Sequence, residues 1–81
     1  MEIHTLKTWP ESFQSIFAGI KKFDVREDDR DFNVQDVLVL REWNNETERY
    51  TGRKVAVEVT YFLKGEFGLP NSLCVMGIER I

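Results

Sequence analysis

The side chains best suited to chemistry lie between Lys21 and Arg30. Lys21, Asp24 and Arg26 follow one another at short spacing in this segment. On a strand, Asp24 and Arg26 lie on one face about 6.6 Å apart, because each residue advances the strand by about 3.3 Å. There Arg26 can pair with Asp24 or present its planar guanidinium group to a ligand. A lysine that points toward apolar neighbours must reach water, pair with a carboxylate or meet an anionic ligand.

The charge pattern leaves a second interpretation of this segment open. Four acidic and four basic side chains lie between Lys21 and Arg30. Runs of mixed charge are usually solvated surfaces that neutralise themselves. On charge pattern alone, a solvated surface is favoured over a binding site.

An aromatic pair with a nearby arginine forms the second candidate set. Trp43 and Tyr50 flank a polar excursion, and Arg53 follows it. Aromatic rings in such a place can stack on a nucleobase, while an arginine adds a cation–π or phosphate contact. The two rings can equally cap the end of a small core. Both interpretations stay open.

Other familiar sites are absent from the sequence. One histidine and one cysteine cannot supply a structural zinc site, and there is no Gly-rich phosphate loop or GxSxG elbow. Cys74 lies in an apolar stretch, where an inert small hydrophobe is expected. His4 is expected to be a surface residue or a hydrogen-bonded structural one. We therefore predict no metal and no cofactor.

One helix is predicted over residues 10–18. Thr8 and Glu11 have the spacing of a capping box, and Pro10 suits the first turn of a helix. Four apolar side chains at i, i+3, i+4 and i+7 then share one helical face: Phe13, Ile16, Phe17 and Ile20. Gly19 is a natural stop for this helix.

Alternation with a period of two predicts strands elsewhere. Phe23 and Val25 alternate with charged residues, so both are expected to face the core, with Lys21 in phase with them. The longest alternating set is expected to share one face: Val55, Val57, Val59, Tyr61 and Leu63. The predicted strands cover residues 4–6, 23–26, 37–43, 55–63 and 73–81. Five short strands and one helix predict a small α+β fold with a closed or nearly closed barrel.

Composition places the chain among globular domains. Its 81 residues suffice for one domain, 1–81, in which 42% of residues are hydrophobic and 31% are charged. The single cysteine rules out an internal disulfide. No apolar stretch is long enough to cross a bilayer or to act as a signal peptide, so we expect a cytoplasmic protein. The net charge of −3 argues against binding duplex nucleic acid mainly through its phosphates.

These residues together resemble an ASCH domain, a module of the PUA-like superfamily. The matching stretch is His4-x-Leu6-Lys7-x-x-Pro10-x-x-Phe13-x-x-Ile16-x-x-Gly19-x-Lys21-x-Phe23-Asp24-x-Arg26-x-x-Asp29-Arg30. The match extends through Asp36-Val-Leu-Val-Leu-x-Glu42-Trp43 and Tyr50-Thr51-Gly52-Arg53, and so covers nearly the whole chain. The resemblance is closest to a short branch of this family, made up of bacterial and phage proteins.

The resemblance implies a small PUA-like β-barrel of about five or six strands with one N-terminal helix packed on it. It also implies a cleft next to the helix. In that setting Lys21, Asp24 and Arg26 are the cleft residues, and Lys7 and Arg30 are their neighbours. RNA-related roles are commonly proposed for ASCH domains.

A related branch contains small amidohydrolases that act on an acylated cytidine through a lysine, a threonine and a glutamate. Lys21 matches that lysine. Asp24 stands in place of the threonine, and no residue aligns with the glutamate. Gln35 also replaces a glycine that usually precedes the family's aspartate, which affects only a turn.

Three functions follow as hypotheses. The leading one is a module that binds RNA, single-stranded nucleic acid or a nucleotide through Lys7, Lys21, Asp24, Arg26, Arg30, Trp43, Tyr50 and Arg53. The second is an amidohydrolase acting on a modified nucleoside, with Lys21 as nucleophile or base and Asp24 as its acid–base partner. The third is a protein-interaction module that uses the surface around Trp43.

Overall fold

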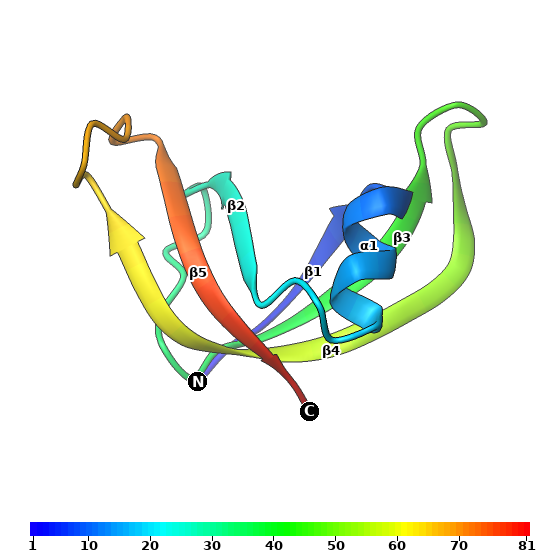
Figure 1. Cartoon of the computed structure of the whole chain (residues 1–81), viewed down its shortest axis with the longest axis horizontal. Coiled ribbons are helices and arrows are strands. Elements are labelled where there is room, and N and C mark those ends of the chain that lie inside the picture. Colours follow the sequence, from blue (N-terminus) through cyan, green and yellow to red (C-terminus); the bar gives the residue numbers. More distant parts are fainter.

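A curled five-stranded sheet holds one short helix in its concave side (Figure 1). The computed structural model describes residues 1–81. Its elements are β1 (Ile3–Thr8), α1 (Pro10–Phe17), β2 (Phe23–Glu27), β3 (Val37–Asn44), β4 (Arg49–Lys64) and β5 (Leu73–Arg80). This arrangement confirms the predicted small α+β fold, with a barrel-like sheet and one helix near the N-terminus. The helix has eight residues, and no helix here has the length and apolar character needed to cross a membrane.

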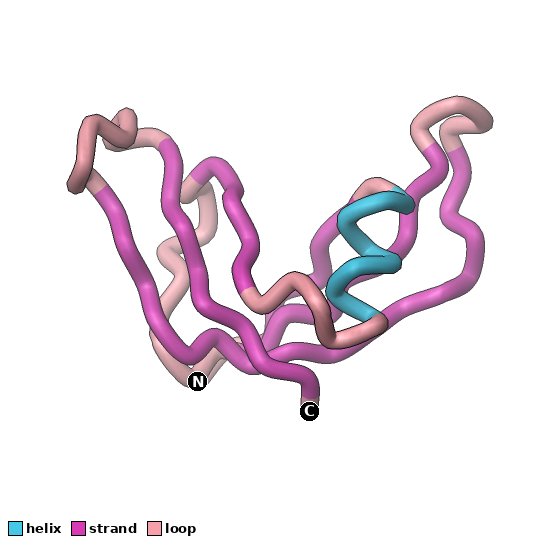
Figure 2. The backbone as a smooth tube through the Cα atoms, in the orientation of Figure 1, coloured by secondary structure: helices cyan, strands magenta, loops and turns pink.

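The sheet is a half-barrel, because its two edge strands do not pair with each other. The strand order is β1-β3-β4-β5-β2, with β1 parallel to β3 and every other pair antiparallel. β4 has 16 residues, and it pairs with β3 through its first part and with β5 through its second part. Figure 2 shows this long strand bending so that both halves of the sheet curve around the helix. The predicted barrel is therefore open along one seam, between β1 and β2.

The core lies between the inner face of the sheet and α1. Alternate residues of the strands face inward, as the two-residue period of a strand requires. The buried apolar side chains are Leu6, Phe13, Ile16, Phe32, Leu38, Leu40, Val55, Val57, Val59, Cys74, Met76 and Ile78. The buried polar side chains are His4, Thr8, Asp24, Asp36 and Glu42. Buried polar groups require hydrogen-bonding partners, and these partners define the sites described below.

The predicted capping box at the start of the helix is wrong. α1 begins at Pro10, with Trp9 at the N-cap and no side-chain hydrogen bond to the helix end. Thr8 instead belongs to β1. Its buried hydroxyl oxygen accepts a hydrogen bond from Arg26, so it is engaged with β2 rather than with the helix.

The helix buries a narrower face than predicted. It ends at Phe17, and Gly19 then adopts a φ of 77°, in the left-handed region that favours glycine. Ile20 therefore leaves the helical face and is 80% exposed. Of the four apolar side chains assigned to that face, only Phe13 and Ile16 are buried.

The side chains of β2 face opposite to the prediction. Phe23 and Val25 are 49% and 48% exposed, whereas Asp24 is buried. Pairing with β5 explains the reversal, because Asp24 and Arg26 lie opposite fully buried residues of β5. Residues that face each other across two strands share one face of the sheet. Asp24 and Arg26 therefore turn toward the inside of the half-barrel.

A bulge in β4 also ends the predicted alternation early. The register shifts between Val59 and Tyr61, so Tyr61 is 65% exposed while Phe62 packs against the core. Gly77 lies opposite this bulge, where an added Cβ atom would come within 2.8 Å of the Thr60 hydroxyl oxygen. Close approach of the two strands explains glycine at this position.

Candidate ligand-binding site

A cleft of about 450 Å³ lies along the open seam of the half-barrel. Its walls come from β1, from β2 and the loop after it, and from the start of β4. The lining residues are Thr5, Leu6, Lys7, Val25, Arg26, Glu27, Asp29, Arg30 and Tyr50. Three of these side chains are basic, two are acidic and one is aromatic. The cleft is thus suited to a ligand that is anionic in one part and flat in another.

The backbone of β1 contributes to one wall of this cleft. The Val37 N–H donates to the Glu2 carbonyl oxygen, and in a parallel pair the backbone groups of successive residues point alternately toward and away from the partner strand. The N–H and C=O groups of Thr5 and Lys7 therefore face the seam. Arg30 donates to the Thr5 carbonyl oxygen at 3.1 Å, in agreement with this orientation.

The backbone of β2 forms the opposite wall in the same way. The Ile78 N–H donates to the Lys22 carbonyl oxygen, and the Asp28 N–H donates to the Ser72 carbonyl oxygen. Because hydrogen bonding alternates along an antiparallel strand, the backbone of Val25 faces the seam rather than β5. Two edges with unpaired backbone groups therefore face each other across the cleft.

Arg26 makes an ion pair within β2 and a hydrogen bond across the seam to β1. The Arg26 Nε–H donates to the buried Asp24 carboxylate, and Arg26 Nη2 donates to Thr8 Oγ1 at 2.9 Å. Asp24 and Arg26 come from β2 and Thr8 from β1, so the guanidinium group links the two edges. A half-buried arginine held by a buried carboxylate has a fixed orientation. Its remaining N–H groups are available to a ligand.

An aromatic pair with two cations lies where β3 ends and β4 begins. The Trp43 and Tyr50 rings meet edge to face, with centroids 4.9 Å apart. Lys7 Nζ lies 3.9 Å from the Trp43 ring centroid, and Arg41 Cζ lies 3.8 Å from the Tyr50 ring centroid. Tyr50 is 39% exposed and lines the cleft. A flat ligand group could stack on Tyr50 beside Arg41 or in its place.

Lys21 lies outside this cleft, in the segment between α1 and β2. Its Nζ donates to Ser12 Oγ at 2.5 Å, and it lies 5.1 Å from the centroid of the Phe23 ring. No hydrogen bond or ion pair joins Lys21 to Asp24, whose carboxylate is bound to Arg26. The acid–base contact expected for an amidohydrolase is therefore not made.

A family model and a similar protein show which family the chain belongs to. The model described as a domain of unknown function, DUF3850, matches residues 3–78. The chain belongs to the DUF3850 family. It is also 34% identical over 59 residues to a protein of Escherichia phage P2 that is described as an uncharacterized 12.9 kDa protein in the GpA 3′ region. The alignment covers 73% of the DUF3850 chain and 52% of the phage protein, so the chain spans about half the length of this relative.

The DUF3850 fold brings together most of the residues predicted as a site. Lys7, Arg26, Arg30 and Tyr50 line one cleft, with Asp24 bound to Arg26. Trp43 lies against Tyr50 and Lys7. The remaining two predicted residues are elsewhere. Lys21 contacts the helix, and Arg53 donates to Gln14 Oε1 at 3.3 Å and lies over the rings of Phe13 and Phe17.

The sequence did not identify two residues, Thr8 and Arg41, that contact this candidate site. Thr8 was assigned to a helix cap, and Arg41 was not considered. Arg41 precedes Trp43 by two residues on a strand, so the alternation that places Trp43 on one face also places Arg41 there. Its position beside Lys7 could not be predicted, because Lys7 pairs with Arg41 through the parallel register of β1 and β3.

Proposed function

We propose that the cleft between β1 and β2 binds single-stranded nucleic acid, RNA in particular, or a free nucleotide. One observation carries this proposal: Lys7, Arg26, Arg30 and Tyr50 come from separate segments of the chain and line the same cleft. Phosphate groups bind lysine and arginine, and nucleobases stack on aromatic rings in a sequence-tolerant way. The same residue types at one cleft support a nucleotide unit as the ligand.

Each side chain has a distinct role in this proposal. Lys7 and Arg30 lie at the surface and would contact phosphate oxygens. Arg26 is held by Asp24 and presents its remaining N–H groups from a fixed position. Tyr50 would stack on a base. Glu27 and Asp29 also line the cleft, so few phosphates can be accommodated.

The resemblance to ASCH domains supports the same function. The chain carries the motif from His4 to Arg30 that resembles this PUA-like module, for which RNA-related roles are commonly proposed. A curled sheet with one N-terminal helix is compatible with that classification. We therefore include an ASCH-type domain in the proposal.

Binding across a salt series tests the proposal. Short single-stranded RNA, single-stranded DNA and duplexes are titrated with the purified protein at increasing salt concentrations. Contact with two or three phosphates of a single strand predicts a slope of log affinity against log salt of about −1.4 to −2.1. The double variant K7A/R30A should bind more weakly and reduce the magnitude of the slope by about 1.4. Tyr50→Ala should weaken binding at every salt concentration and leave the slope unchanged, because stacking releases no counterions.

Lys22→Ala is the matched control. Lys22 is exposed and lies outside the seam cleft, so its loss should leave both affinity and slope close to those of the unmodified chain. Absence of binding by any single strand or mononucleotide at low salt would overturn the proposal. So would binding that K7A/R30A and K22A weaken equally.

A further inference from the structure

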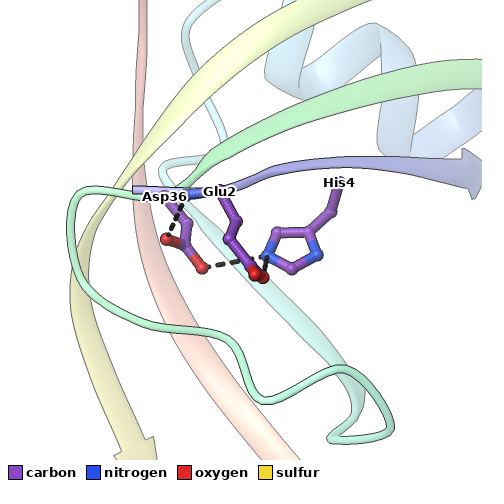
Figure 3. Close-up of side chains that lie close together, drawn as sticks. All are labelled: Glu2, His4 and Asp36. Carbon is purple, nitrogen blue, oxygen red and sulfur yellow. Dashed lines mark hydrogen bonds and ion pairs between the residues drawn. The ribbon is translucent and has the colours of Figure 1, made fainter.

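We propose that Glu2, His4 and Asp36 form a binding site for a zinc-type divalent metal ion. Two of the three come from the N-terminal end of the chain and the third from the residue that precedes β3 (Figure 3). One potential ligand atom from each side chain lies within 4.8 Å of the others. The sequence predicted no metal site, because Asp36 reaches His4 only through the parallel pairing of β1 with β3.

The two ligand-atom separations that involve His4 are close to those around a tetrahedral ion. His4 Nε2 lies 2.9 Å from Asp36 Oδ2 and 3.8 Å from Glu2 Oε2. Zinc–nitrogen and zinc–oxygen bonds of about 2.0–2.1 Å place neighbouring ligand atoms about 3.3–3.4 Å apart in a tetrahedron. The two observed separations lie on either side of this value, so shifts of about half an ångström would bring both to it.

Asp36 is already held in position as a ligand would be. Its Oδ1 accepts from the Glu2 N–H and its Oδ2 from the Asn33 N–H, both at 3.0 Å. Outer hydrogen bonds of this kind orient metal-binding carboxylates and strengthen binding. His4 is fixed too, since its ring is 7% exposed and packs edge-on against Phe32 with centroids 4.8 Å apart. Two ligands are therefore preorganised before an ion arrives.

Glu2 distinguishes this cluster from an ordinary buried histidine–aspartate pair. The His4–Asp36 hydrogen bond already gives each of these two buried side chains a partner. Glu2 is 72% exposed, yet its carboxylate also approaches the same His4 nitrogen (Figure 3). An exposed third ligand gives an ion a route from solvent and leaves a fourth position open to water. One imidazole and two carboxylates form a nitrogen–oxygen donor set, and both kinds of ligand are common in zinc sites that keep a position open to water.

A bound ion would take the place of the hydrogen bond between His4 Nε2 and Asp36. Imidazole coordinates a metal in its neutral form, through the ring nitrogen that carries no proton, so the His4 N–H would lie on Nδ1 in the bound state. The ion would join β1, which carries Lys7, to the loop that leads from Arg30 to Asp36. It would thereby fix two walls of the seam cleft from a site outside it.

Titration of the untagged, chelator-treated protein tests this site. Zn²⁺ is measured by competition with a chromophoric chelator, and Co²⁺ by its visible absorption. We expect saturation at one equivalent of either ion and a higher melting temperature with Zn²⁺ present. Glu2→Gln should weaken Zn²⁺ binding by about tenfold or more. Because the Glu2 side chain is exposed, this variant should keep the metal-free melting temperature of the unmodified chain.

Glu79→Gln is the matched control, since it removes one exposed carboxylate from the end of β5. It should bind Zn²⁺ as the unmodified chain does. Failure to saturate at one equivalent would overturn the proposal. Equal Zn²⁺ affinity in E2Q and E79Q would overturn it as well, because the ion would then be held by surface carboxylates in general.

Discussion

At the scale of single residues, Asp36 accepts more hydrogen bonds than any other side chain described above. Its carboxylate accepts from the Glu2 N–H, the Asn33 N–H and His4 Nε2. Burial acts to raise the pKa of Asp36, but these three hydrogen bonds and the nearby His4 charge outweigh it and hold the pKa below 3.8. The ionised form of Asp36 is therefore favoured by folding.

Asp36→Asn should destabilise the protein by about 1–3 kcal/mol at pH 7, because an amide cannot replace every acceptor and leaves buried donors unpaired. A group whose pKa is lowered by folding contributes stability above its unfolded pKa and loses it as pH falls through its folded pKa. The difference in unfolding free energy between the two proteins should thus shrink as pH falls below about 4. Urea unfolding of the unmodified chain and of Asp36→Asn, from pH 7 to pH 2 in the presence of EDTA, measures this difference. A difference that stays constant over this range would contradict the assignment.

At the scale of elements, the bulge in β4 and the glycine opposite it act together. Gly77 faces Thr60 and Tyr61, and an added Cβ would lie 2.8 Å from the Thr60 hydroxyl oxygen and 3.3 Å from the Tyr61 Cβ. Such distances are shorter than ordinary van der Waals contacts. A side chain at residue 77 would therefore force Thr60 and Tyr61 to shift.

Gly77→Ala should destabilise the protein by about 1–3 kcal/mol through overpacking. Thr60→Ala alone should change stability by less than about 0.5 kcal/mol, because Thr60 is exposed. Removal of the threonine hydroxyl relieves the shorter contact, so the double variant should be more stable than Gly77→Ala alone. Chemical denaturation of all four proteins forms a complete double-mutant cycle. If the changes in unfolding free energy of the two single variants simply add up in the double variant, the Thr60 contact does not cause the destabilisation by Gly77→Ala.

The limits of sequence-based prediction also lie at the scale of elements. The helix at residues 10–17 and the strands were predictable, because their apolar periods are local. Which side chains of β2 point toward the core could not be predicted, because this depends on pairing with β5, about 50 residues away. That pairing turns Asp24 and Arg26 inward and leaves Lys21 outside the seam cleft. Lys7 and Arg30 were predicted as neighbours of a cleft, but the family resemblance supplied that prediction rather than any local pattern.

At the scale of the whole molecule, the half-barrel shields Cys74. Its side chain is fully buried on β5, and burial, followed by the nearby Asp28 and Asp24 carboxylates, raises the pKa of its thiol. Both effects suppress the reactive thiolate. Reaction with an external reagent therefore requires an opening of the sheet.

Labelling with a thiol reagent at pH 8 should be slower in the native protein than in the urea-unfolded protein by about a hundredfold or more. The slow rate should rise in parallel with destabilisation in Gly77→Ala, because both report on the pairing of β4 with β5. Mass spectrometry after quenching gives the labelled fraction. Native labelling as fast as in urea would mean that β5 is not held in the sheet.

The position of β5 in the sheet also fixes an order of assembly. β2 has no partner except β5, and residues 28–72 separate the two strands. At about 5–20 residues per second, a ribosome needs about 2–9 s to make that stretch. During this interval β1 can pair with β3 and β3 with β4, while Asp24 and Arg26 remain without the strand that turns them inward. The seam cleft is therefore completed last during synthesis, so a nascent chain cannot engage a ligand there before residues 73–77 have emerged.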